Sequence, residues 1–396
     1  MHRELLVHWN SKYHALIGTN ASIYCARCAG QPNTLIFDEF ERIQKEAILN
    51  ISSGLAFRAV VHVCKETNCG GLGDRMRSAI SAFLLAIATK RAFFMHHDKP
   101  IDSSIFFRAL RKDISLYLPH HWKDVIHTTK SRSKNIPFFQ PHNTIPINWL
   151  ENDVESMLFS NNTGVLTIRN NDYYVPQLIK NPFTKLALQA IGADQEALMP
   201  YCLLNYIFHP TDIVLAELSR IGLPSNLSLS DPQRNSAYIA IHFRSGNNSV
   251  TKDPARVPIA AMKDFFTCAT AMENRLLRKY LNLRHVDWLI ASDDENVLKE
   301  ADLLYGLRKL VAKRSGDIVH IDKFLPSSTN SHTGFLRVVT EHLLLAFADE
   351  IVMSPSGFSV YSYYRKHVID SGTSEARMYP FRFPSDIYTT CTRLND

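Results

Sequence analysis

Two blocks of the sequence alternate short apolar segments with amphipathic helices, and this alternation constrains the fold more than any other feature. In the first block, a β-branched segment from Ala56 precedes a glycine turn at residues 69–75, a helical pattern, and a second apolar segment at Arg91–His97. The second block repeats the pattern, with strands predicted at Ala237–Phe243, Val286–Ser292 and Glu350–Ser354. Strands that alternate with helices form parallel sheets. The sequence therefore predicts an α/β protein with two Rossmann-like, doubly wound domains facing across a cleft.

A polar, turn-rich stretch at Leu223–Ser236 lies between the two blocks and is the predicted linker. We expect a helical lead-in at 1–54, an N-terminal α/β domain at 55–235, a C-terminal Rossmann-like domain at 236–370 and a tail at 371–396. Smaller elements are also predicted, namely a helix at 35–49, a strand at Val165–Arg169, and short strands at 309–313 and 317–322.

The composition is that of a globular chain. Of 396 residues, 45% are hydrophobic and 21% are charged, which excludes a disordered protein. The net charge is +6 and the basic residues are scattered, which suits a small anionic ligand better than nucleic acid. No apolar run reaches the ~18 residues of a membrane span. We expect the chain as given to be soluble, and it is compatible with the lumenal part of an anchored protein.

The cysteines and sequons bear on the compartment. Cys25 and Cys28 form one C-x-x-C without the second pair that a zinc ribbon needs, so they are two thiols or a local disulfide. Cys64 and Cys69 can close a short loop as a disulfide in an oxidising compartment. N-x-S/T sequons occur at Asn20, Asn50, Asn161, Asn226 and Asn247. Together these features favour the secretory pathway, in the Golgi or the lumen of the endoplasmic reticulum.

Polar side chains follow the three predicted strands of the second block, at the edge where parallel sheets bind ligands. They are His242, Arg244 and Gly246, then Ser292, Asp293 and Asp294, then Ser354, Ser356, Gly357 and Ser359. A guanidinium binds phosphate with two hydrogen bonds, and a helix start such as the one predicted at Ser356 favours an anion. Carboxylates accept hydrogen bonds from ribose hydroxyls or base N–H groups. The set predicts a pocket for a nucleoside diphosphate.

Ordinary structural explanations exist for each of these residues. Arg244 alone can be a surface ion pair, and an Asp-Asp pair before a helix is usually an N-cap. Other nucleotide sites are disfavoured, because the turn at residues 70–75 lacks the third glycine of a dinucleotide fingerprint and no P-loop pattern occurs. The adjacent histidines at 96–97 and 120–121 are poorly spaced for a metal, so no metal site is expected.

Four motifs occur in a familiar order. They are GGLGDR at residues 70–75, HFRSG at His242–Gly246, ASDDENVLKEA at Ala291–Ala301 and TEHLLLAFADEIVMSPSGFS at Thr340–Ser359. In order and spacing they resemble the GDP-fucose-dependent fucosyltransferases of GT-B fold, a superfamily of α1,2-, α1,6- and protein O-fucosyltransferases. The resemblance covers about Val60–Arg91 and Tyr238–Arg365 and is closest to the α1,6 group.

The resemblance implies an inverting transfer of fucose from GDP-fucose to a glycan or glycoprotein hydroxyl. Arg244 would bind the β-phosphate and stabilise the leaving GDP, while Asp293 and Asp294 would hold the ribose and guanine. The other implied donor-binding residues are His242, Gly246, Glu341, Ser356, Gly357, Phe358 and Ser359, with Gly71, Gly73, Asp74 and Arg75 across the cleft. Neither a metal nor another cofactor is expected, because an arginine and helix N–H groups neutralise the diphosphate.

The sequence departs from the family pattern at two places. Asn247 replaces an acidic residue after the HFRSG motif, and Asp253 matches the glutamate base of the α1,6 group only with a one-residue insertion. Asp253 is the expected general base, with Asp74 as the alternative, and some relatives have no obvious base.

Two alternatives to fucosyl transfer stay open. The chain can be a GT-B-like glycan- or nucleotide-binding protein that performs no transfer, or a transferase that uses another nucleotide sugar. The acceptor, the linkage and the oligomeric state are not predicted.

Overall fold

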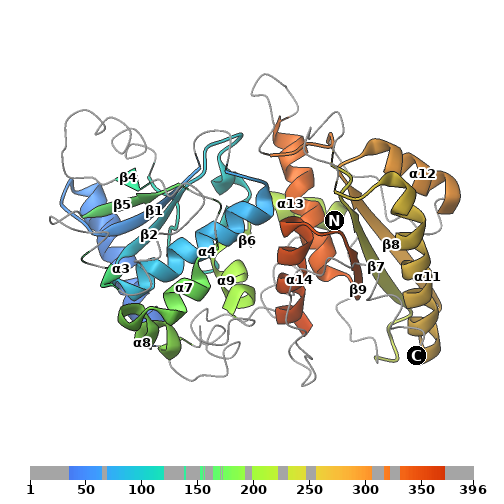
Figure 1. Cartoon of the computed structure of the whole chain (residues 1–396), viewed down its shortest axis with the longest axis horizontal. Coiled ribbons are helices and arrows are strands. Elements are labelled where there is room, and N and C mark those ends of the chain that lie inside the picture. Colours follow the sequence, from blue (N-terminus) through green and yellow to red (C-terminus); the bar gives the residue numbers. More distant parts are fainter. Residues whose placement is uncertain are drawn as a thin grey trace. The chain divides into compact units, whose positions relative to one another are not determined.

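The computed structural model describes residues 35–64, 69–119, 138–139, 152–154, 156, 164–169, 171, 173–191, 199–221, 231–246, 256–305, 316–321 and 331–370. These residues fall into two compact units that divide between Thr211 and Asp212. We call them the first and the second unit and describe each by itself (Figure 1).

The first unit is built on a parallel sheet with the order β2-β1-β5-β4. Its strands are β1 (Ala59–Val63), β2 (Ala92–His96), β4 (Phe138–Phe139) and β5 (Val165–Ile168). Every residue of β1 and β2 is buried, as the β-branched and aromatic side chains of these segments predict. Helix α4 (Leu72–Ala88) joins β1 to β2 and packs on both, which confirms the predicted β-α-β unit.

Further elements of the first unit surround this sheet. They are α3 (Leu35–Ser52), η1 (Ser103–Ile105), β3 (Phe107–Arg108), α7 (Val175–Lys180), α8 (Pro182–Ala190), α9 (Met199–Ile207) and β6 (His209–Pro210). Strands β3 and β6 form a separate antiparallel pair. Helix α3, which the sequence places in the lead-in, packs on the outer strand β2. Its fully buried Gln44 donates to the carbonyl of Phe93 (2.9 Å) and accepts from the Phe93 N–H (2.8 Å), so α3 satisfies the backbone of the edge strand.

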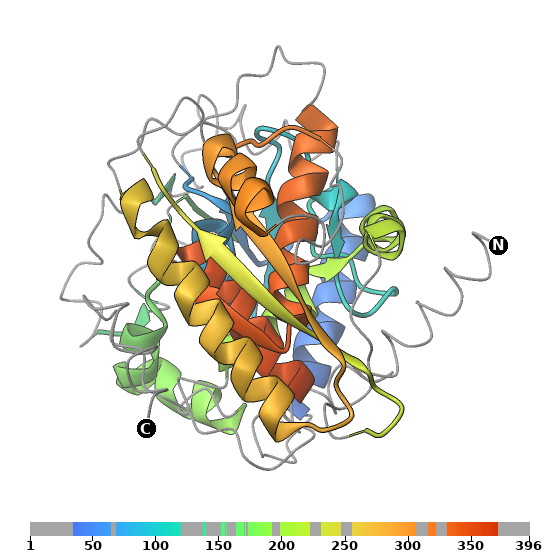
Figure 2. The same ribbon diagram turned by 90° about the vertical axis from the view of Figure 1, so that its right-hand side faces the viewer.

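The second unit contains a parallel sheet with the order β8-β7-β9. Its elements are α10 (Asp212–Ile221), β7 (Ser236–Phe243), η3 (Ile259–Ala261), α11 (Met262–Lys279), β8 (His285–Ser292), α12 (Glu295–Tyr305), α13 (Ser331–Phe347), β9 (Glu350–Met353) and α14 (Gly357–Asp370). Figures 1 and 2 show α11 along one face of the sheet, with α13 and α14 on the other. This layering is the doubly wound arrangement predicted for the second block.

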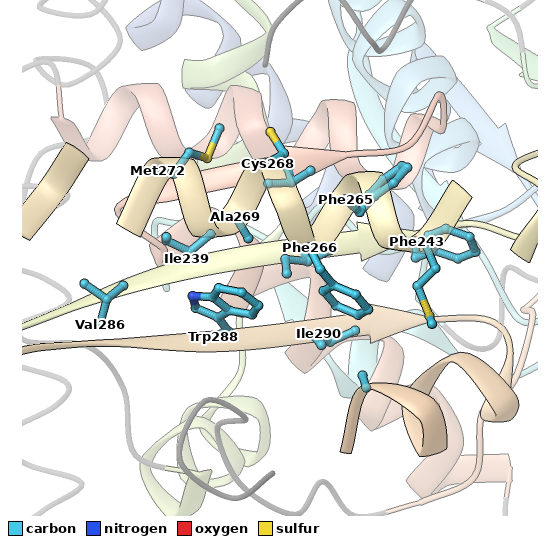
Figure 3. Close-up of a cluster of buried hydrophobic side chains, with 14 of the residues drawn as sticks. Ile239, Phe243, Phe265, Phe266, Cys268, Ala269, Met272, Val286, Trp288 and Ile290 are labelled. Atoms are coloured by element: carbon cyan, nitrogen blue, oxygen red, sulfur yellow. The ribbon is translucent and has the colours of Figure 1, made fainter. Parts of the chain in front are cut away.

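The core of the second unit lies between α11 and the sheet (Figure 3). Phe266 of α11 stacks on Trp288 of β8, with ring centroids 6.2 Å apart, and contacts Tyr305 of α12 at 4.7 Å. Phe265 packs edge-on against Phe243 of β7 at 5.0 Å. These aromatic contacts, together with the buried Met262, Ala269 and Leu276 of the same helix, hold α11 on the sheet.

The structure departs from the sequence analysis at one predicted strand. Within the described residues 317–321 no strand forms. A Cβ added at Gly334 would meet the side chain of Val319, so this segment packs against the beginning of α13 and does not extend the sheet. The strand predicted at 309–313 lies outside the described residues. The division at Thr211 precedes the predicted boundary at 235 because α10 packs on α13; the remaining domain bounds stay predictions.

None of the helices in the described part of the chain combines the length and the apolar character that crossing a bilayer requires.

Truncating Phe266 tests the packing of α11. Phe266→Ala is expected to lower the free energy of unfolding by about 3–5 kcal/mol, because it leaves a cavity beside Trp288. Urea unfolding followed by circular dichroism measures the change. Leu281→Ala is the control, since Leu281 is 91% exposed and its loss should change stability by less than about 0.5 kcal/mol. A loss below about 1 kcal/mol for Phe266→Ala would contradict the assigned core.

Candidate functional site

The three strands of the second unit end at one edge of the sheet. His242 of β7 is level with Ala291 of β8 and Met353 of β9. The residues that follow each strand therefore emerge side by side, as the sequence analysis predicts. This edge is the candidate site.

Arg244 and Asp293 form a largely buried ion pair at this edge. The side chain of Arg244 is 10% exposed and that of Asp293 is 11% exposed. Asp293 also accepts from the backbone N–H of Ser245 (2.8 Å) and of Gly246 (3.1 Å). Gly246 has a φ of +62°, which glycine adopts without strain. Asp293 thus holds both the guanidinium and the loop after β7, a role that the sequence analysis does not predict.

Asp294 is the N-cap of α12. Its Oδ1 accepts from the backbone N–H of Asn296 (2.9 Å), and its own N–H donates to Ser292 Oγ (3.1 Å). This is the ordinary structural explanation for the second carboxylate of an Asp-Asp pair. The geometry gives no separate support for its predicted nucleotide contact.

Ser354 ties the ends of β7 and β9 together. Its hydroxyl donates to the carbonyl of His242 (2.7 Å) and accepts from the backbone N–H of Arg244 (2.8 Å). The backbone of Arg244 is therefore anchored to Ser354, which lies two residues before Ser356 in the sequence.

The Ser356 turn forms the beginning of α14. Ser356 Oγ accepts from the backbone N–H of Phe358 (3.3 Å), and Gly357 is the first residue of the helix. Ser359 is fully buried, and its single hydroxyl proton lies within hydrogen-bond distance of the carbonyls of Ser354 (3.0 Å) and Ser356 (3.2 Å). Ser356 and Ser359 thus shape the turn. The beginning of α14, which is the positive end of the helix dipole, therefore lies next to the backbone of Arg244.

His242 lies beneath these two features. It is 4% exposed, and its ring centroid is 5.1 Å from that of Phe358. Burial lowers the pKa of His242 to about 4, and the Arg244 charge also lowers it, while Asp293 and Glu341 raise it. His242 is therefore neutral at pH 7. Its Nδ1 is buried and has no hydrogen-bond partner among the residues that the structure describes.

Glu341 of α13 belongs to the same region, since its charge acts on the pKa of His242. The residue is 7% exposed. Its Oε1 accepts from Arg337 Nε (3.0 Å), and the same guanidinium donates from Nη1 to the carbonyl of Gly316 (2.9 Å). The sequence analysis misses Arg337, although its position four residues before Glu341 on one helix is the signal for such a pair.

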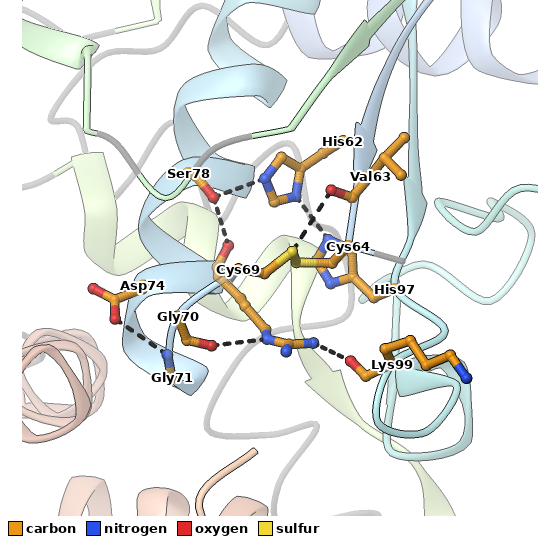
Figure 4. Close-up of a disulfide and its surroundings, with 11 residues drawn as sticks. His62, Val63, Cys64, Cys69, Gly70, Gly71, Asp74, Ser78, His97 and Lys99 are labelled. Carbon is orange, nitrogen blue, oxygen red and sulfur yellow. Dashed lines mark hydrogen bonds between the residues drawn. A yellow bond between two sulfur atoms is a disulfide. The ribbon is translucent and has the colours of Figure 1, made fainter. Parts of the chain in front are cut away.

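The glycine turn of the first unit is braced internally (Figure 4). Cys64 and Cys69 form the predicted disulfide beside it. Gly70 has a φ of +75°, and a Cβ there would meet the Asp74 side chain at 2.6 Å, so glycine is required. Asp74 accepts from the Gly71 N–H (3.1 Å) and pairs with Arg77 (3.2 Å).

Arg75 is also engaged within the turn. It is 3% exposed, its Nε donates to the carbonyl of Gly70 (3.2 Å), and its NH1 donates to that of Lys99. These contacts favour a structural role for Arg75 over the predicted contact with a donor. Gly71 and Gly73 begin α4 and lie in the same turn.

A buried chain of polar side chains lies behind this turn (Figure 4). Ser78 Oγ is 2.7 Å from His62 Nε2, and His62 Nδ1 is 2.7 Å from His97 Nε2. Burial, with the charges of His62, Arg75 and His96, lowers the pKa of His97 well below 6.5. No group of three potential metal ligands occurs among the residues that the structure describes. The sequence does not reveal this chain, because its members come from β1, α4 and the end of β2.

Several predicted residues lie outside the described parts of the chain. They are Asp253, the expected base, Asn247, and the Cys25–Cys28 pair. Their roles stay predictions.

Comparison with known proteins identifies the fold. A mutant of Arabidopsis thaliana FUT1 in complex with GDP matches with a TM-score of 0.56 and 18% identity, over 84% of this chain and 77% of that chain. Fucosyltransferase NodZ from Bradyrhizobium, and NodZ α-1,6-fucosyltransferase soaked with GDP-fucose, each match with a TM-score of 0.41 and 15% identity over 78% of this chain, covering 93% and 92% of theirs. The fold assignment rests on the match to FUT1, whose TM-score is higher than those of the two NodZ structures.

No family model and no curated protein sequence matches the chain. The match to the FUT1 structure nevertheless confirms, at the level of the fold, the resemblance to GDP-fucose-dependent fucosyltransferases that the motifs suggest.

The pH dependence of stability tests the environment of His242. The unfolded chain binds a proton at this residue below about pH 6.5, whereas the folded chain does so only below about pH 4. Stability therefore falls as the pH falls through this window, and His242 contributes about 2 kcal/mol of loss between pH 7 and pH 5. His242→Gln should reduce the measured loss by that amount in urea unfolding at the two pH values. An equal loss in both proteins would show that His242 is not buried as a neutral group.

Proposed function

We propose that the chain is an inverting glycosyltransferase that moves fucose from GDP-fucose to a hydroxyl of a glycan or glycoprotein. The observation that carries the proposal is that Arg244, at the end of β7, and the beginning of α14, after β9, lie at the same edge of the sheet. The backbone N–H of Arg244 donates to Ser354 Oγ, and the Ser356 turn follows Ser354 directly. A diphosphate suits such a place, because the helix dipole and an arginine both favour an anion.

The ion pair with Asp293 prepares Arg244 for this role. It holds the guanidinium in place at a nearly buried position before an anion arrives, and a preorganised charge stabilises a developing negative charge without reorganisation. Arg244 would then neutralise the β-phosphate as the bond between fucose and GDP breaks. No metal is needed in this mechanism, since the arginine and the N–H groups of α14 supply the positive charge.

The remaining roles follow the motif resemblance. His242, Gly246 and Glu341 would line the donor site, and Asp294 would contact the nucleotide in addition to capping α12. Asp253, or alternatively Asp74, would accept the proton of the acceptor hydroxyl. Asp74 already accepts from the Gly71 N–H and pairs with Arg77, and both contacts stabilise its charged form, so they make it a weaker base.

We propose further that the first unit binds the acceptor and faces the second unit across a cleft, as in the GT-B fold. The FUT1 structure that shares this fold is a complex with GDP, which supports a guanine nucleotide as the ligand. The Cys64–Cys69 disulfide supports a location in the secretory pathway, in the Golgi or the lumen of the endoplasmic reticulum, because disulfides persist in oxidising compartments.

Nucleotide titration tests the donor class. GDP should bind at least tenfold more tightly than UDP or ADP, in the presence of EDTA, as measured by isothermal titration calorimetry. Equal affinity for the three nucleotides would overturn the guanine assignment, and binding that requires added Mg²⁺ would overturn the metal-free mechanism. Release of GDP from GDP-fucose in the presence of a mixed glycan pool separates a transferase from a binding protein.

Removal of Arg244 tests the charge mechanism. Arg244→Ala should lower kcat for GDP release by about 10²–10³, the usual cost of losing one preorganised charge. Arg275→Ala is a matched control, since Arg275 pairs with Glu350 at the opposite, amino end of β9 (2.5 Å). Its activity should remain within about twofold of the wild type. Unchanged turnover in Arg244→Ala would eliminate the proposed role.

A further inference from the structure

A histidine to which the sequence analysis assigns no role, although it lies within the motif at Thr340–Ser359, is close to the Ser356 turn. His342 of α13 is fully buried, and its Nδ1 is 2.8 Å from Ser362 Oγ of α14. The same hydroxyl is 2.9 Å from the carbonyl of Phe358, one helical turn earlier. Ser362 therefore links His342 to the first turn of α14.

The hydrogen bonds determine which nitrogen of His342 carries the proton. Ser362 has one hydroxyl proton, and the carbonyl of Phe358 can only accept, so the hydroxyl donates to Phe358. Ser362 Oγ then accepts from His342 Nδ1–H. Burial and the Arg365 charge lower the pKa of His342 well below 6.5, so the ring is neutral and Nε2 is unprotonated. This directional chain, Nδ1–H to hydroxyl to carbonyl, fixes both side chains in one orientation.

Phe358 connects this chain to the candidate site. Its ring centroid lies 5.4 Å from that of His342, in an edge-on arrangement, and 5.1 Å from that of His242. Phe358 is the second residue of α14, and its N–H bonds to Ser356 Oγ (3.3 Å). The three rings thus form a continuous series of ring contacts from α13, through the beginning of α14, to the end of β7.

We propose that His342 is a positioning residue that sets the beginning of α14 relative to the end of β7 and thereby determines how tightly the site holds the second phosphate of its nucleotide. This inference rests on the proposed function. His342 touches no ligand; it acts through Ser362 and Phe358. Its effect falls on the terminal phosphate because the N–H groups at the start of α14 and the Arg244 guanidinium must meet the same group.

The alternative is that His342 merely fills the core between α13 and α14. The two roles differ in what they do to nucleotides of different length. Loss of a residue that only stabilises the fold lowers the fraction of folded protein but leaves the dissociation constants of the folded protein for GDP and GMP unchanged. A residue that positions the helix start weakens GDP selectively, because GMP lacks the β-phosphate.

The experiment compares the dissociation constants of GDP and GMP by calorimetry in wild type, His342→Leu, His342→Asn and Ser362→Ala. His342→Leu and Ser362→Ala should raise the Kd for GDP about tenfold and that for GMP less than twofold. His342→Asn keeps an N–H donor near the position of Nδ1 and should recover most of the GDP affinity. Circular dichroism at the assay temperature verifies that each variant is folded.

Thr270→Ala is the matched control. The Thr270 hydroxyl makes the same kind of bond to the carbonyl four residues earlier, Phe266 O at 2.9 Å, but on α11. Its loss should leave both constants unchanged. If His342→Leu does not fold, Ser362→Ala decides the question. Equal weakening of GDP and GMP, or no change in a folded variant, overturns the inference. Failure of the wild type to bind GDP overturns the proposed function instead.

Discussion

The ion pair of Arg244 and Asp293 is the interaction on which the candidate site depends. Neither side chain is more than 11% exposed, so each charge would be costly without the other. The Asp293 carboxylate also accepts hydrogen bonds from the backbone N–H groups of Ser245 and Gly246, and these bonds hold the loop after β7 in place. One buried carboxylate therefore orients the guanidinium and shapes the backbone that surrounds it.

Side chains complete the backbone hydrogen bonding at other strand ends in the same way. At the beginning of β7, Asp349 accepts from the Tyr238 N–H (2.8 Å) and pairs with Arg234. In the first unit, Gln44 satisfies both polar groups of Phe93 on an outer strand. Each of these groups supplies a hydrogen-bond partner to a strand backbone where a neighbouring strand does not. The short parallel sheets of both units thus rely on polar side chains at their margins, and the candidate site is one such margin.

The sequence predicts the elements of the structure better than their polar connections. Strands such as Ala59–Val63 are recognisable because both faces are buried and the residues are β-branched. The segment at 317–321 looks similar, yet it packs on α13, and no local pattern distinguishes a strand from an apolar segment that packs on a helix. The positions of Arg244 and the Ser356 turn at one edge follow from strand order alone.

Contacts between residues that are distant in the chain cannot be predicted from local sequence patterns. Asp293 could be recognised as a polar residue after a strand, but not as the partner of Arg244, because 49 residues separate them and the pairing depends on register. His342 and Ser362 belong to different helices whose packing brings them together. The contact of Asp294, by contrast, is local and could be predicted. Its position before a helix indicates an N-cap, and the structure has that cap.

Buried neutral histidines lie at the carboxyl end of the main sheet in each unit, and their neutrality suits the charge of the candidate site. Burial lowers the pKa of His97 in the first unit and of His242 and His342 in the second. A protonated His242 would add a charge beside Arg244, where each cation disfavours the other. Because His242 stays neutral, the ion pair with Asp293 sets the charge at this edge, and an anion that enters meets an arginine already held in place. The burial that makes the fold less stable at acidic pH is thus the same burial that keeps His242 from adding a second cation beside Arg244 at neutral pH.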